Sequence, residues 1–473
     1  MQLFIHDKHQ ASRVGLCILV AALGWGCKLR KAPDTAQTVE AGLPEGSEIP
    51  EGWAAGVDDG YVDDGWVATF EDPQLDELVD EAIQNNLNLR LAAAQVERAA
   101  GLSRIAASYL KPSIAIAADA GGRGATRQVG GENALSGATY GATVNMQWEA
   151  DVWGKLRARK AAGEEALEAT KADFEFARLS LAAATSKTWF LATTAREQRD
   201  LADEAVETFG RTLEVVEAKK RVGQVSEQDV SLASADVASA QEARELAESG
   251  YQEVQRALEV LLGRYPSAEI GSAAVLQVVP PPISVGIPAD IIARRPDLIA
   301  AERRVAAAFY QREDARLARL PSFTLNAQGG YTSLAGAIGQ LSAGMYAPLY
   351  TGGLLEGQVD VATADQKTAI AAYGQTLLNA FQEVENALAN EDLFAKREKY
   401  LEKAVAENQR ALEKVKAQFK VGRIDLLSVL QIQARVLGAR SALIAVRNER
   451  LAQRVNLHLA LGGSFEQPDR SNE

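Results

Sequence analysis

Apolar and polar side chains alternate over two short stretches in each half of the chain. From Thr139 to Glu149 every second residue is apolar or aromatic, and the residues between are polar or glycine. A period of two predicts a β-strand with one apolar and one polar face. Ile114 and Ile116 predict its partner strand, which gives a hairpin over residues 112–149.

The second half repeats this alternation. Phe323, Leu325 and Ala327 alternate with polar residues, and a returning strand is expected from Leu341 to Leu349. The pattern therefore predicts a second hairpin over residues 321–350, and four strands in the chain.

After each hairpin the apolar spacing becomes helical. One continuous helix from Gly154 to Val222 would be roughly 100 Å long. A Val-Gly turn follows, and a second helix returns to Gly263. In the second half a leucine or isoleucine recurs every seven residues from Leu430 to Leu451, which is coiled-coil spacing. Coiled coils are thus expected over residues 154–263 and 353–462.

The two halves are copies of each other. Three glycines of the first half recur 199 residues later, the pairs being Gly154 and Gly353, Gly223 and Gly422, and Gly263 and Gly462. Pro112 recurs as Pro321, 209 residues later, so the first copy contains ten extra residues between its proline and its first glycine. A duplication of this length predicts two equivalent structural units.

The remaining segments complete the expected organisation. Asp72-Pro73 is a strong helix start, and the helix is expected to run to about Tyr109. We divide the chain into a leader (1–26), an extended, weakly ordered and lipid-anchored segment (27–65), a first repeat (66–265), a linker (266–296), a second repeat (297–465) and a tail (466–473).

The N-terminus resembles a bacterial lipoprotein leader. Lys8 and Arg13 precede an apolar run, Val14 to Trp25, that is too short to span a bilayer. Gly26 and Cys27 follow at once, so Cys27 is the expected lipid attachment site. A plain secretory leader with an incidental cysteine is the alternative.

Composition excludes several functions. The net charge of −13 argues against a nucleic-acid partner. Both cysteines precede residue 28, and only one histidine, His458, lies beyond the leader. We therefore expect no catalytic residues, no cofactor and no metal site. His458 is expected to pack within its helix, and Met146 and Met345 to face lipid.

Four amphipathic strands cannot stand alone in a membrane, because an open sheet edge leaves backbone groups unpaired in lipid. Closed barrels need at least eight strands. Two, three or four copies of this chain would supply eight, twelve or sixteen. The fold class expected from the residues is thus an α+β membrane protein, and a soluble β-sandwich on a helical stalk is the alternative.

Several motifs, in order within the repeat, resemble the outer-membrane efflux protein family, which contains the TolC-like ducts, and in particular its lipoprotein (OprM- or NodT-type) branch. They are Asp72-Pro73-Gln74-Leu75, Trp148-Glu149-Ala150-Asp151-Val152-Trp153-Gly154, Ile287-Pro288-Ala289-Asp290, Arg294-Arg295-Pro296-Asp297 and Leu457-His458-Leu459-Ala460-Leu461-Gly462-Gly463.

The resemblance implies a homotrimer with a 12-stranded transmembrane β-barrel and a long α-helical coiled-coil tunnel. It also implies a place in the cell outer membrane, lipid-anchored and extending into the periplasm. The function implied is the exit duct of a tripartite efflux pump. Its partners would be a periplasmic adaptor (membrane fusion) protein, an inner-membrane RND-type transporter and outer-membrane lipid.

The resemblance further implies that the two helix-to-helix turns contact the adaptor and that the resting tunnel closes nearby. The adaptor-contacting residues would be Val222, Gly223, Val225, Ser226, Val421, Gly422, Arg423, Ile424 and Asp425. The family often closes its tunnel with acidic rings, but this chain has Ser428 and Gln431 six and nine residues after the tip glycine. The expected aperture consists of Leu427, Ser428, Gln431 and Asp229, and Asp425 is the nearest acid in its own copy.

Two other functions are compatible with the sequence. One is an outer-membrane duct for type I protein secretion, and the other is a lipid-anchored periplasmic coiled-coil scaffold without a pore. The cargo stays open, because a passive duct need not recognise what passes through it.

Overall fold

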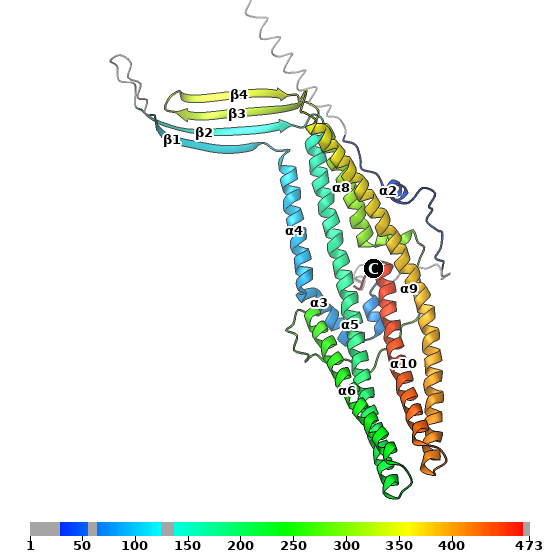
Figure 1. The fold of residues 1–473 in the computed structure, drawn as a ribbon. Helices are drawn as coiled ribbons and strands as arrows, with labels where there is room; N and C mark the ends of the chain where they lie inside the picture. Colours follow the sequence, from blue (N-terminus) through cyan, green and yellow to red (C-terminus); the bar gives the residue numbers. More distant parts are fainter. Residues whose placement is uncertain (1–28, 55–63, 124–136, 467–473) are drawn as a thin grey trace, which may run out of the picture. The chain divides into compact units, whose positions relative to one another are not determined.

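The computed structural model describes residues 29–54, 64–123 and 137–466. The chain divides into two compact units. Within the described residues, the first unit comprises residues up to Gly46, Gln95–Ala172 and Ala300–Thr376, and the second comprises the remainder. The two helices of residues 155–221 and 354–420 belong to both units, and Figure 1 shows the course of each.

The first unit contains one antiparallel sheet of four strands in the order β1-β2-β3-β4. The strands are β1 (Ser113–Arg123), β2 (Gly137–Ala150), β3 (Ser322–Thr332) and β4 (Gly336–Tyr346). The two expected hairpins are therefore present. β4 ends at Tyr346, short of the expected Leu349, because Pro348 has no N–H to donate to a neighbouring strand.

The strand register places like side chains in rows across the sheet. Ser113, Gln147, Asn326 and Ser342 form one row of paired positions. The next row on the other face is apolar and contains Ile114, Met146, Ala327 and Leu341. Because side chains alternate between the faces of a strand, one face of the sheet is polar and the other apolar, as the sequence predicts.

The register also locates the ten extra residues of the first copy. Arg123 lies 11 residues after Pro112, and Thr332 lies 11 residues after Pro321. The segment between β1 and β2 has 13 residues, whereas the segment between β3 and β4 has three. The insertion therefore falls entirely between the first two strands.

The helices of the two copies match in length. α4 (Leu87–Ser108) and α8 (Pro296–Leu317) each have 22 residues. α5 (Lys155–Arg221) and α9 (Leu354–Lys420) each have 67, and α6 (Glu227–Leu261) and α10 (Leu426–Ala460) each have 35. A continuous helix of 67 residues is about 100 Å long, so the expected long helices are confirmed.

The three repeated glycine pairs occupy left-handed backbone positions. Their φ angles are 89° and 88° at Gly154 and Gly353, 72° and 71° at Gly223 and Gly422, and 71° and 69° at Gly263 and Gly462. A residue with a Cβ adopts this conformation only at a cost, which glycine avoids. These glycines set the points at which the chain enters or leaves a long helix.

Polar contacts are duplicated as well. The Asn86 side-chain amide donates to the carbonyl of Leu261 at 2.9 Å, and the Arg295 guanidinium donates to that of Ala460 at 3.0 Å. Donor and acceptor are each repeat-equivalent. In both copies a polar residue before the 22-residue helix therefore satisfies a carbonyl at the end of the 35-residue helix.

Two expectations about the N-terminal third were wrong. The helix starting at Pro73 is interrupted, because α3 (Pro73–Asn85) ends at Asn86 and α4 begins beyond it. The Asn86 side-chain oxygen accepts from the N–H groups of Asn88 and Leu89 at 2.9 and 3.1 Å, which caps the new helix.

The segment after Cys27 is not extended throughout. It contains a helix, α2 (Thr35–Gly42), whose N-cap Asp34 forms a capping box with Gln37. In the first unit this helix ends against α9, where a Cβ added to Gly374 would lie 1.9 Å from the carbonyl oxygen of Gly42.

The core of the second unit forms around η1 (Trp66–Phe70), a 3-10 helix whose Trp66 is 2% exposed. Asp72 caps α3 and also accepts from the Trp189 indole at 2.8 Å and from Gln277 at 2.7 Å. The short helix α7 (Asp290–Arg294) precedes α8.

Elements from both copies share the core around η1, because Leu451 and Val455 of α10 belong to the same buried cluster as Trp66.

Among the described residues, α10 is long and apolar enough to cross a membrane by length and composition. Its sequence nevertheless contains five arginines. Leu426, Val429 and Leu430 pack into a cluster shared with the other long helices. We therefore interpret its apolar residues as packing surface.

His458 is packed, as expected from its position in α10. Its ring stacks on Trp66 with centroids 5.6 Å apart, and neither ring nitrogen has a hydrogen-bond partner within the described residues. Burial, and then the charge of Arg454, lowers the pKa of His458 to about 3. Folding therefore keeps this imidazole neutral where an unfolded chain would protonate it.

This depressed pKa predicts a pH-dependent stability. The unfolded chain binds a proton at His458 below about pH 6.5, whereas the folded chain does so only near pH 3. The contribution of His458 to the free energy of unfolding is complete above pH 6.5 and falls by about 1.4 kcal/mol per pH unit below it. We expect the midpoint of thermal unfolding in detergent to fall less between about pH 7.5 and about pH 5 in His458→Phe than in the wild type. Equal falls in both proteins would contradict the prediction.

Candidate functional site

The two helix-to-helix turns of the second unit have the same geometry. Gly223 donates to the Lys220 carbonyl at 2.9 Å and Gln224 to that of Lys219 at 2.9 Å. In the other turn Gly422 donates to the Phe419 carbonyl at 3.1 Å and Arg423 to that of Gln418 at 3.0 Å. This paired pattern is a Schellman motif, which satisfies the last carbonyls of a helix. The tips are therefore rigid, hydrogen-bonded reversals.

The exposed apolar residue at each tip directly precedes the glycine. Val222 and Val421 are each 68% exposed. Val225 and Ile424, which the sequence analysis offered as contact residues, are half-buried and pack against a cluster formed by all four long helices. These two side chains help to hold the tips together, and their contact with an adaptor stays a prediction.

The acids next to the tips cap helices. Ser226 is the N-cap of α6, and Asp229 accepts from its N–H at 2.8 Å and its hydroxyl at 2.7 Å. Asp425 is the N-cap of α10 and accepts from the Ser428 N–H at 2.9 Å. Hydrogen bonds from the side chain of Ser428 and then from its backbone N–H lower the pKa of the Asp425 carboxyl below its usual value. Both carboxylates are thereby committed to the backbone at the start of a helix.

A lysine that was not predicted as a site residue links the two tips. Lys219 Nζ donates to the carbonyl of Phe419 at 2.7 Å and lies 4.4 Å from the centre of the Phe419 ring. The available signal was the run Lys219-Lys220-Arg221 in the last turn of α5, where cations favour the negative helix end. Arg423, in the other turn, is exposed.

The remaining aperture candidates lie at the start of α10. Leu427 is 53% exposed, and Gln431, four residues later on the same helical face, is also exposed. Ser428 is half-buried. Leu427 and Gln431 thus form one exposed strip, and Ser428 lies beside it.

In the first unit the polar face of the sheet is hollowed. A concavity of about 310 Å³ is lined mainly by amide and hydroxyl side chains from all four strands. The lining includes Ser113, Asn145, Gln147, Asn326, Gln328, Gln340 and Ser342. Met146 belongs to the apolar row, and Met345 is 66% exposed.

Two further expectations concern the lipid attachment site and metal binding. Cys27 lies outside the described residues. Within the residues that the structure describes, no group of three or more His, Cys, Asp or Glu side chains is placed to hold a metal ion.

Curated relatives match this chain over nearly its full length. The pyoverdine export outer membrane protein OpmQ of Pseudomonas putida is 28% identical over 95% of this chain and 97% of its own length. The toluene efflux pump outer membrane protein TtgF of Pseudomonas putida is 29% identical over 93% of this chain and 95% of its own length. The cation efflux system protein CusC of Escherichia coli is 26% identical over 95% of this chain and 98% of its own length.

Solved structures share the fold. The outer membrane protein VceC of Vibrio cholerae superposes with a TM-score of 0.78 at 26% identity, covering 86% of this chain and all of that chain. The open state of the MtrE outer membrane channel of Neisseria gonorrhoeae superposes with a TM-score of 0.80 at 23% identity, covering 94% of this chain and 99% of that chain.

The family comparison covers both copies of the repeat. The outer membrane efflux protein model matches residues 78–264 and 287–463, which include every long helix and all four strands. Two matched copies, a sheet with one polar and one apolar face, and paired glycine tips agree with that match. The chain belongs to the outer membrane efflux protein family.

Proposed function

We propose that this chain is the outer-membrane exit duct of a tripartite efflux pump, conducting small molecules passively from the periplasm to the outside. The observation that carries the proposal is a four-stranded, two-faced sheet with β1 and β4 at its edges, in a chain of this family. In lipid such edges must be paired, because no water reaches their backbone groups.

Closure is proposed to require three copies. Three sheets supply twelve strands, which exceeds the minimum of eight for a membrane barrel. The row of Ser113, Gln147, Asn326 and Ser342 then faces a wet lumen, and the row beginning at Ile114 faces lipid. Ile114 and Leu341 are 68% and 81% exposed in the single chain, which supports a lipid-facing assignment.

The pump partners are proposed to be a periplasmic adaptor, which contacts the tips, and an inner-membrane RND-type transporter. The rigid turns with exposed Val222 and Val421 support a docking surface there. The relatives' names concern export or efflux of pyoverdine, toluene and cations, which favours efflux over protein secretion. No catalytic role is proposed.

Cys27 is proposed to carry the lipid anchor. The segment that follows it is tied to the unit that contains the sheet. Thr35 donates to Glu302 at 2.6 Å, and the Ala32 N–H donates to the Tyr310 hydroxyl at 3.4 Å. A lipid at Cys27 and a barrel formed by this unit then share one membrane.

Native mass spectrometry of the detergent-extracted protein tests the duct directly. We expect a trimer in which each chain carries added diacylglyceryl and acyl mass at Cys27. A folded monomer would remove the physical basis of the duct, and a trimer of unmodified chains would remove only the anchor. The Cys27→Ser variant is the matched control for the lipid mass.

The tip assignment predicts the effect of a bulky residue. Space around Gly422 is open, so Gly422→Trp should fold and trimerise while blocking adaptor contact and abolishing efflux, measured as intracellular dye retention. Gly422→Ala is the control, because it places the same strain on the left-handed backbone without the bulk. Full efflux by the tryptophan variant would contradict the tip assignment.

The aperture is proposed to be a polar constriction rather than an acidic ring. Asp425 and Asp229 cap helices, which leaves Leu427 and Gln431 on the exposed strip with Ser428 beside it. The Ser428 bond to Asp425 includes its backbone N–H, so Ser428→Ala retains that cap.

Removing these polar groups should open the resting channel. We expect the double variant Ser428→Ala, Gln431→Ala to raise resting conductance in planar bilayers several-fold, since each lost hydrogen bond contributes about 1 kcal/mol. Gln224→Ala, at the tip but outside the strip, is the control. Unchanged conductance of the double variant would exclude both residues from the gate.

A further inference from the structure

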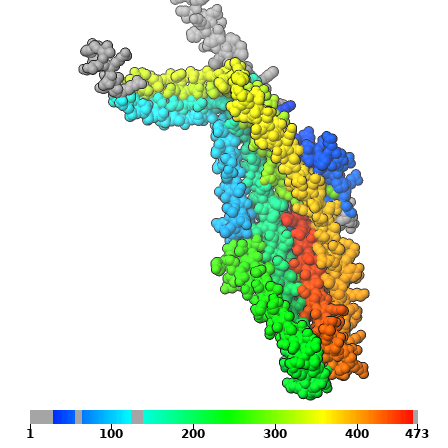
Figure 2. All heavy atoms as spheres, viewed as in Figure 1, coloured from blue at the N-terminus to red at the C-terminus, as the bar shows by residue number. Residues whose placement is uncertain are grey.

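The polar face of the sheet carries a band of side-chain amides. Two neighbouring rows of paired positions contain five of them, and they are Asn145, Gln147, Asn326, Gln328 and Gln340. We call these five residues the amide band. All five line the concavity of about 310 Å³, and their side chains are exposed or half-buried. The strands that carry them lie at the surface of the single chain (Figure 2). The band is therefore accessible from solution.

The duplication does not account for the amide band. Residues 209 positions apart are equivalent in β1 and β3, and residues 199 positions apart are equivalent in β2 and β4. At the positions equivalent to the five amides, the other copy has Ala117, Asp119, Gly141, Gly344 and Tyr346. No amide of the band is thus matched by an amide in the other copy. Strand pairing nevertheless brings amides from both copies into the same two rows, so the band is a property of the assembled sheet.

Most amides of the band have unused hydrogen-bonding groups. The Asn145 amide donates to the Thr143 hydroxyl at 3.2 Å. The other four side-chain amides make no hydrogen bond with any residue that the structure describes. A primary amide offers two N–H donors and an oxygen that accepts two hydrogen bonds. Neighbouring strands lie about 4.8 Å apart, and side chains on one face recur about every 6.8 Å along a strand, so the band is a regular grid of donors and acceptors.

The two rows of the amide band contain no charged side chain, in a chain of which 24% of residues are charged. On the same face, Glu149 lies one row away towards the end of β2, and Asp119 lies two rows away in the other direction. Glu149 is paired with Lys155 at 2.6 Å, which neutralises the nearer of the two acids. Hydrogen bonding, without net charge, is therefore what the band offers to a solute.

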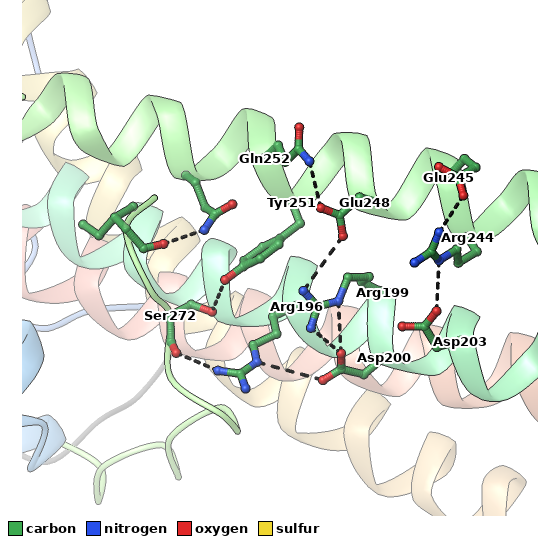
Figure 3. A network of polar contacts seen from close by, with 12 residues as sticks. Arg196, Arg199, Asp200, Asp203, Arg244, Glu245, Glu248, Tyr251, Gln252 and Ser272 are labelled. Carbon is green, nitrogen blue, oxygen red and sulfur yellow. Dashed lines mark hydrogen bonds and ion pairs between the residues drawn. The ribbon is translucent and has the colours of Figure 1, made fainter. Parts of the chain in front are cut away.

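The helices of the second unit build their polar surface from charges instead. Where α5 meets α6, Arg244 pairs with Asp203 at 3.0 Å, and Arg199 lies 3.9 Å from Glu248 (Figure 3). Uncharged amides exert no such Coulomb attraction on an ion. An ion that left water for the amide band would lose hydration without meeting a countercharge. The band is therefore suited to uncharged solutes.

We propose that the amide band is a subsite of the duct that retains uncharged solutes carrying several hydroxyl groups, as oligosaccharides do. A hydroxyl group donates one hydrogen bond and accepts two, so it complements the amides. Each such bond replaces bonds to water and contributes little, so retention requires several bonds at once. The inference rests on the proposed trimeric duct, because three sheets are needed to close the band into a ring around a lumen.

Ligand-observed saturation-transfer NMR tests the subsite on the detergent-extracted, full-length trimer. The probe is maltohexaose, in a detergent without a sugar headgroup that competes for the amides. We expect the wild type to give a saturable transfer signal. Gln328→Met with Gln340→Met keeps the length of both side chains and removes their amides. This double variant should bind the probe about 25-fold more weakly, since each lost hydrogen bond corresponds to a factor of about five.

Thr324→Val is the matched control for this double variant. The substitution is nearly isosteric and removes one hydroxyl on the same face of β3, one row outside the amide band. The control should bind maltohexaose as the wild type does. Equal binding by the wild type and the double methionine variant would place the probe elsewhere and overturn the subsite.

The remaining outcomes separate the subsite from the duct. A trimer by native mass that gives no transfer signal would overturn the subsite and leave the duct proposal intact. A folded monomer would remove both proposals. Loss of the signal in Thr324→Val as well as in the double variant, with both proteins trimeric, would show that binding does not depend on the amides and would also overturn the subsite.

Discussion

The edges of the sheet constrain the whole chain. β1 and β4 each have one strand neighbour, so each carries backbone groups that no other described strand pairs. In water such groups bind solvent, but in lipid they must be paired by another strand. Closure by further copies of the chain follows from this requirement, and the proposed trimer is one arrangement that satisfies it. The helical part of the chain then has to bring copies together in one orientation and at one height, which is a matter of matched helix lengths and fixed turns.

The duplication satisfies that second requirement by keeping geometry and varying charge. The left-handed glycines, the helix lengths and the bonds of Asn86 and Arg295 to a helix end are retained in both copies. At the same time Arg199 and Glu248 of the first copy correspond to Glu398 and Arg447 of the second, an ion pair with its signs exchanged. Backbone features define the repeat, and side-chain charge distinguishes its two halves.

Much of the fold could be predicted from the sequence, because its signals are long and repeated. Strand alternation extends over about ten residues, and glycine pairs 199 residues apart fix the helix lengths. The break at Asn86 was missed because a single side chain that bonds to the backbone ahead of it leaves the helical period almost unchanged. α2 was missed because the composition of its segment hides a capping box of only four residues.

The local roles of the residues near the tips were harder to predict than the fold, for a physical reason. A carboxylate near a helix start can line an aperture or cap the helix, and composition does not separate the two. The spacing of Ser226 and Asp229 is that of a capping box and could have indicated the second role. The link from Lys219 to Phe419 joins residues 200 positions apart and has no local pattern.

The equal lengths of α5 and α9 have an evolutionary consequence. One residue added to either helix would rotate everything beyond it by about 100° and shift it by about 1.5 Å. The tips would then fall out of step with the strands between the two copies. Length changes in these helices must therefore occur in both copies together, as whole heptads. The connection between β1 and β2 differs by ten residues from its counterpart, so the duplicated chain has accepted a length change between strands but not within these helices.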